Sequence, residues 1–193
     1  MMKKTLLGLG IVLGTMASAQ SATGPRFGIK AGGNLSTLTH EEARSKAGFH
    51  AGVFMNASVA RNFNIQPEVV YSAQGATTDD KNNVKNNRYN LNYINVPIML
   101  QYYAIPAFYL EAGPEFGFLV SARNRYEFEG ETITEDQKQY TRSFNAGIGL
   151  GGGYRFTPGF SAYARFNAGL ASMSKNNNGM KQNNFSLGVS YMF

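Results

Sequence analysis

Residues 184–193 (NFSLGVSYMF) alternate strictly between apolar side chains and small or polar ones. The apolar positions fall on one face of an extended strand: Phe185, Leu187, Val189, Tyr191 and Phe193. On a terminal strand of a soluble domain this face would be exposed to water. A membrane-spanning β-strand can instead turn one face to lipid and the other to a polar lumen. We therefore interpret this segment as a transmembrane β-strand, which requires an even number of similar strands in the chain.

The same period-two pattern recurs along the chain. The expected strands are residues 26–35, 47–60, 65–75, 91–103, 108–121, 143–156, 160–170 and 184–193. The connections between these strands alternate between short turns and long polar loops. The long loops are expected at 36–46, 76–90, 122–142 and 171–183. This predicts an all-β, eight-stranded antiparallel up-and-down transmembrane barrel, with short periplasmic turns, long extracellular loops and both mature termini in the periplasm.

Two residues fit this pattern poorly. Phe54 falls on the polar face of its strand. Pro67 cannot donate a hydrogen bond to a neighbouring strand, so we expect it at a strand start or a bulge. Repeated short strands would also suit a secreted soluble sandwich, but a sandwich would not need every second connection to be tight.

The N-terminal residues have the features of an export signal. Residues 1–4 include two lysines, residues 5–16 are apolar but too short to span a bilayer, and Ala17-Ser18-Ala19 is an A-x-A cleavage site. We predict a signal peptide over residues 1–19 and one barrel domain over residues 20–193. No Cys is present, which excludes a lipid-anchored lipoprotein, thiol catalysis and cysteine metal sites.

The net charge does not alter this interpretation of the chain. The formal net charge of +6 falls to +4 without Lys3 and Lys4, and the remaining charges are scattered rather than gathered in a basic run. An exported chain with this distribution is not expected to bind nucleic acid. No segment after residue 19 is long and apolar enough for a transmembrane helix.

Several segments occur in a fairly specific order. They are 27–36 (FGIKAGGNLS), 64–75 (NIQPEVVYSAQG), 91–103 (LNYINVPIMLQYY), 108–120 (FYLEAGPEFGFLV) and the strand ending at Phe193. In this order the chain resembles the PorT-type family of small outer-membrane β-barrel proteins. The resemblance implies an eight-stranded barrel in outer-membrane lipid and implies no reaction or cofactor. It also implies that Tyr191 and Phe193 belong to a signal read by the barrel assembly machinery.

Six charged side chains are expected to face the lumen: Lys30, Glu68, Glu111, Glu115, Arg155 and Arg165. An eight-stranded barrel is only wide enough for side chains to fill its interior, and buried charges must pair. We expect a network that plugs the lumen, so that the protein has a structural or interaction role and contacts an extracellular partner through its loops. A narrow channel for ions or small solutes is the alternative.

An enzyme is the less favoured hypothesis. A lipid-modifying barrel would need His and Ser on the lipid face near the outer rim, whereas His50 is expected in the lumen and His40 in the first loop. Glu111 and Glu115 lie about 13 Å apart along a strand, too far for an acid–base pair unless a neighbouring strand supplies a partner. Asp79 and Asp80 lack calcium-loop spacing, and the glycines of 147–153 lack the residues of a phosphate loop. We therefore predict no catalytic residue, cofactor or metal.

Overall fold

The computed structural model describes residues 24–39, 43–78, 84–128, 131–139, 141–170 and 181–193. The predicted signal peptide, with Ala17 and Ala19, lies outside these residues. Nine strands fall within them: β1 (Arg26–Leu38), β2 (Ala43–Ala60), β3 (Phe63–Thr78), β4 (Val84–Ile105), β5 (Phe108–Phe128), β6 (Glu131–Asp136), β7 (Phe144–Arg155), β8 (Phe160–Gly169) and β9 (Gln182–Met192). The described residues include no helix long and apolar enough to cross a bilayer.

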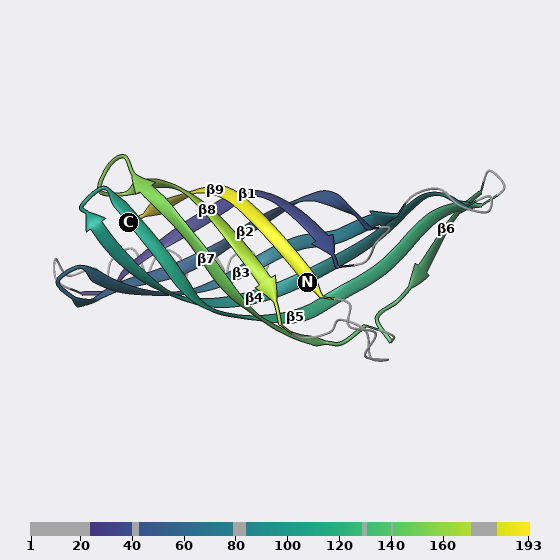
Figure 1. Ribbon diagram of the computed structural model, residues 1–193, viewed down its shortest axis with the longest axis horizontal. Coiled ribbons are helices and arrows are strands. Elements are labelled where there is room, and N and C mark those ends of the chain that lie inside the picture. Colours follow the sequence, from purple (N-terminus) through teal and green to yellow (C-terminus); the bar gives the residue numbers. More distant parts are fainter. Residues whose placement is uncertain (1–23, 40–42, 79–83, 129–130, 140, 171–180) are drawn as a thin grey trace, which may run out of the picture.

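Eight of these strands close into an antiparallel barrel (Figure 1). The order around the barrel is β1-β2-β3-β4-β5-β7-β8-β9, and β9 pairs with β1. In the closing ladder Ile29 lies opposite Tyr191 and Leu35 lies opposite Phe185. The predicted eight-stranded barrel is confirmed, and the segment at 184–193 is the strand that closes it.

The barrel is apolar on its outer face and polar in its interior, which is the reverse of a soluble protein. Leu187 and Leu150 are 60% and 57% exposed on the outer face, whereas Glu68 and Arg165 are buried in the lumen. Within the described part of the chain, most buried side chains are polar or charged. A barrel that exposes aliphatic side chains and buries ionic ones is suited to lipid outside and polar contacts inside.

The tight connections gather at one end of the barrel, where the C-terminus also lies (Figure 1). The turns at Arg61-Asn62 and Pro106-Ala107 are two residues long. The terminal residue is held here by the backbone, because the Phe193 N–H donates to the Phe27 carbonyl at 2.9 Å. Arg26 Nε donates to the Phe193 carbonyl at 3.2 Å.

Three of the four predicted long loops are partly strand, which corrects the sequence interpretation. β1 continues to Leu38, β3 to Thr78 and β5 to Phe128, while β2 and β4 begin at Ala43 and Val84. β6 pairs with β5 alone, so it is a ninth strand outside the closed barrel. The exposed face of the β5 extension carries charged side chains, such as Arg123 and Arg125, in place of aliphatic ones, so the apolar–polar alternation ends although the strand continues. The fourth loop, 171–183, lies mostly outside the described residues.

The expected position of Pro67 is wrong. Pro67 is the fifth residue of β3 and pairs with Ile98 of β4. The register with β2 is unchanged across it, since Phe54 pairs with Glu68 and Ala57 with Ile65. A missing N–H removes one ladder bond, and the bonds on either side hold the register.

Phe54 is a true exception to the alternation of apolar and polar faces, and a glycine accommodates it. Its ring lies in the lumen with 5% exposure. A Cβ on Gly28 would lie 2.3 Å from Phe54 Cζ, so only glycine leaves room for the ring at that position of β1.

Candidate functional site

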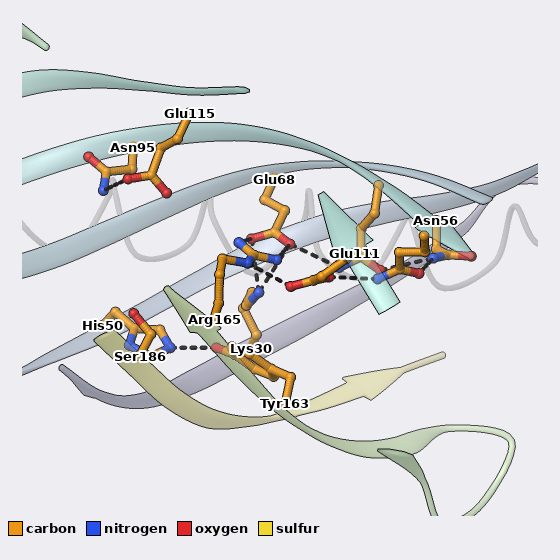
Figure 2. A network of polar contacts seen from close by, with 12 residues as sticks. Lys30, His50, Asn56, Glu68, Asn95, Glu111, Glu115, Tyr163, Arg165 and Ser186 are labelled. Carbon is orange, nitrogen blue, oxygen red and sulfur yellow. Dashed lines mark hydrogen bonds and ion pairs between the residues drawn. The ribbon is translucent and has the colours of Figure 1, made fainter. Parts of the chain in front are cut away.

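Four of the six predicted lumenal charges meet at the middle of the barrel (Figure 2). Lys30 comes from β1, Glu68 from β3, Glu111 from β5 and Arg165 from β8. Lys30 Nζ lies 3.0 and 2.9 Å from the two carboxylate oxygens of Glu68. Arg165 donates to the same carboxylate from Nη1 at 3.0 Å and Nη2 at 2.7 Å, and to Glu111 from Nε at 2.7 Å. We call these four residues the ion network.

Glycines make the space that this network occupies. Gly52 lies opposite Lys30 in the β1–β2 ladder, so the lysine can reach past β2 to Glu68 on β3. A Cβ on Gly151 of β7 would lie 2.5 Å from the Ala164 carbonyl and 3.2 Å from Arg165 Cβ. The glycine run of β7 therefore gives room to a long side chain.

The ion network is balanced and its carboxylates are saturated. Two cations face two anions, each residue no more than 5% exposed. Gln66 Nε2 donates to Glu68 at 2.9 Å, and Gln101 Nε2 donates to Glu111 at 3.1 Å, so every carboxylate oxygen accepts at least one hydrogen bond. Saturation of this kind is what makes buried charges tolerable, because removing one partner would leave the other charge unpaired.

The polar contacts continue toward the end with the tight turns. Asn56 Nδ2 donates to Gln66 at 2.9 Å and to Gln101 at 2.8 Å, which links the amides that hold the two carboxylates (Figure 2). The lumen is therefore crossed by connected side chains from β1, β2, β3, β4, β5 and β8.

Glu115 and Arg155 face the lumen but stay outside the ion network. Arg155 lies near the tight turns, where it donates to the Tyr103 hydroxyl at 2.6 Å and lies 4.9 Å from the centre of that ring. Glu115 accepts a hydrogen bond from Asn95 Nδ2 at 3.0 Å. Among the described side chains it has no ion-pair partner.

A second polar group, centred on His50, adjoins the ion network. His50 Nδ1 lies 2.7 Å from Asn34 Oδ1, and its Nε2 contacts the Tyr163 hydroxyl. Lys30 Nζ lies 3.9 Å from the centre of the Tyr163 ring. Alternation placed these side chains in the lumen, but their pairing depends on strand register, which the sequence does not reveal. His40, Asp79 and Asp80 lie outside the described residues.

The chemistry of the lumen is ionic and amide-based. Among the residues that the structure describes, no group of three or more His, Cys, Asp or Glu side chains could hold a metal ion. His50 contacts an amide and a phenol, and the nearby Ser186 hydroxyl donates to Asn34 at 3.0 Å rather than to the imidazole.

A closed barrel with an aliphatic exterior and an ionic lumen is the expected form of an outer-membrane protein, and the sequence comparison decides the family. Residues 18–175 match the family described as outer membrane protein beta-barrel domain. The chain belongs to this family. It is a small outer-membrane β-barrel protein.

Solved structures show the same fold. Neisserial surface protein A is 14% identical, with a TM-score of 0.58 over 86% of this chain and 97% of that one. Ail, the attachment invasion locus protein of Yersinia pestis, is 12% identical, with a TM-score of 0.54 over 88% of this chain and 99% of that one. At such identities the likeness shows the fold alone. No curated protein matches the chain.

Proposed function

We propose that this outer-membrane barrel is closed to solutes and acts as an interaction protein, through the part of its sheet that extends beyond the membrane. The buried ion network carries the proposal. It places side chains of four strands across the lumen, and a solute could pass only by separating charges that hold each other at 2.7–3.0 Å. Membership of the PorT-type group is part of this proposal, as is an orientation with the tight turns and both mature termini in the periplasm.

The expected result in planar lipid bilayers is the absence of steady single-channel currents. The ion network has no surplus charge that could exchange with a passing ion, and its members are almost fully buried. Conductance measurement on the purified barrel tests this directly. Steady currents that persist after repeated purification would favour the narrow-channel hypothesis instead.

The extension of the sheet carries the proposed contact surface. β4 and β5 are 22 and 21 residues long, and β6 lies beside their far end (Figure 1). Arg88 lies directly opposite Arg125 in the β4–β5 ladder. Like charges in that arrangement repel each other, so an anion between them would be stabilising. A hollow of about 320 Å³ lies at this pair and is also lined by Asn90, Tyr126, Glu127 and Thr132.

We infer that a sulfated polysaccharide is the partner chemistry that suits this surface. Two adjacent guanidinium groups offer the paired donors that sulfate oxygens accept. Arg123 adds a third positive charge, with Asp136 opposite it in the β5–β6 ladder. One solved structure with the same fold is that of Ail in complex with the heparin analogue sucrose octasulfate, with a TM-score of 0.53 and 12% identity.

Binding of sucrose octasulfate to the folded barrel is expected to weaken roughly tenfold in Arg125→Ala, because one charge-assisted contact is lost. Titration calorimetry at fixed salt gives the dissociation constant. Lys138→Ala is the matched control, since Lys138 is an exposed cation just after β6 and its removal changes net charge equally. Equal affinity for wild type and Arg125→Ala, or an equal loss in both variants, would reject this site.

Deletion of Phe193 is expected to lower the amount of barrel in the outer membrane more than it lowers the stability of the folded protein. Phe193 makes one hydrogen bond to the Phe27 carbonyl and accepts one from the Arg26 side chain, which are few beside the ladder bonds of β9. The proposed assembly signal, in contrast, would be lost. Heat-modifiable gel migration of the membrane fraction measures assembly, and urea unfolding of refolded protein measures stability. Similar assembled amounts with and without Phe193 would remove the support for this role.

A further inference from the structure

Two small cavities adjoin the ion network on the side of the extended strands. Each has a volume of about 20 Å³, and both are lined by Asn95, Glu115, Asn167 and Asn184. A cavity of this volume admits one water-sized particle. A ligand here must therefore be a water molecule or a dehydrated ion of similar size.

Charge balance distinguishes these two ligands. The ion network is neutral by itself, with Lys30 and Arg165 engaged by their two carboxylates. Glu115 adds a negative charge that no described side chain pairs with, and Figure 2 shows it beside Asn95, apart from the ion network. An unpaired carboxylate in a lumen of low dielectric is costly, and a single positive charge beside it would remove that cost.

The hydrogen bonds around Asn34 determine the orientation of the Asn184 amide, which lines both cavities. Asn34 Nδ2 donates to the Phe49 carbonyl at 3.2 Å, and a carbonyl only accepts, so Asn34 Oδ1 is the atom that accepts from Ser186 Oγ at 3.0 Å. Because the single Ser186 proton is used there, its oxygen must accept from Asn184 Nδ2, which lies 3.0 Å away. The remaining atom of that amide, Asn184 Oδ1, is buried and accepts no hydrogen bond within the described protein.

A second unpaired acceptor lies on Gln182. Gln74 Nε2 donates to Ser72 Oγ at 2.8 Å, and Gln74 Oε1 accepts from Gln182 Nε2. Gln182 Oε1 is then buried without a donor, and so is Asn167 Oδ1. These two residues and Asn184 are 4–8% exposed. The cavity walls therefore carry unpaired oxygen acceptors, and the hydrogen bonds fix this polarity for Asn184.

We propose that the cavity also lined by Gln182 is a binding site for one dehydrated monovalent cation, Na⁺ or K⁺. Glu115 supplies the balancing charge, and the free oxygens of Asn184, Gln182 and Asn167 supply neutral ligands. Carboxylate and amide oxygens suit hard cations. One carboxylate balances one positive charge, whereas a divalent ion would leave an excess charge buried. The site is independent of the polysaccharide surface, so the failure of either proposal would leave the other standing.

The test is urea unfolding of the refolded, full-length mature barrel in lipid vesicles, at constant ionic strength, in sodium, potassium or choline chloride. Choline is too large for the cavities. We expect a higher unfolding midpoint in sodium or potassium than in choline. A cation at ten times its dissociation constant would raise the folding equilibrium constant about elevenfold, with saturation at higher concentration.

Glu115→Gln is the decisive variant, because it retains an oxygen for the Asn95 hydrogen bond and removes only the charge. It should fold, and its midpoint should be the same in all three salts. Glu131→Gln, an exposed carboxylate on β6, is the control and should keep the wild-type salt difference. Identical wild-type midpoints in the three salts would overturn the proposal, as they would mean a water molecule or a protonated Glu115. A salt difference that survives Glu115→Gln would overturn it equally.

Discussion

Replacement of Glu68 by Gln is expected to destabilise the folded barrel by about 3–5 kcal/mol, because it leaves buried cations without their main partner. The Glu68 carboxylate accepts from Lys30 at 3.0 and 2.9 Å and from Arg165 at 3.0 and 2.7 Å. With this charge removed, Glu111 alone faces both cations in the ion network. The free energy of unfolding, measured by urea titration in lipid vesicles with the gel shift as the readout, gives the effect.

Two comparisons show that the loss comes from charge imbalance. Glu131→Gln removes an exposed carboxylate on β6 and should change the stability by no more than about 0.5 kcal/mol. The double variant Lys30→Met/Glu68→Gln removes one charge of each sign and leaves the Arg165–Glu111 pair intact, so it should recover part of the loss. If Glu68→Gln were as stable as wild type, the ion network would not hold the lumen together.

The barrel was predictable from sequence because the membrane imposes alternation on every spanning strand. Lipid selects apolar side chains at every second position, and the lumen selects polar ones between them. This rule identified Leu187 as lipid-facing and Ser186 as lumenal. It failed beyond the membrane, where β6 (ETITED) has water on both faces and only one neighbouring strand. Nothing in such a segment distinguishes a strand from a loop except its pairing with β5.

The site was only partly predictable, because alternation gives the direction of a side chain but not its height in the barrel. Lys30 and Glu68 meet because Gly52 lies opposite Lys30 on the intervening strand and because the register puts Glu68 only two residues from Val70, which faces Gly52 on β3. Arg155 also points inward, yet it lies at the end with the tight turns and contacts Tyr103. Glu115 faces the lumen on the same strand as Glu111 but lies four residues farther along, and this separation keeps it out of the ion network. Register is a property of paired strands, so a single strand's sequence cannot supply it.

Replacement of Leu150 by Arg is expected to destabilise the barrel by about 2–4 kcal/mol, since it places a charge at the centre of the lipid-facing band. Leu150 is 57% exposed and lies midway along β7, between the outward rings of Phe144 and Tyr154. Aromatic side chains of that kind favour the two membrane interfaces, which puts Leu150 near the bilayer midplane. Urea unfolding in lipid vesicles measures the loss.

Val59→Arg is the matched control. Val59 is 59% exposed, as open as Leu150, but it lies beside the tight turn at Arg61 and therefore near an interface. There an arginine should cost only about 0–1 kcal/mol, because its long side chain can reach the headgroups. A loss that depends on depth identifies lipid as the solvent of the outer face. Equal losses at both positions would mean that the exposed aliphatic band does not span a bilayer in the way the strands suggest.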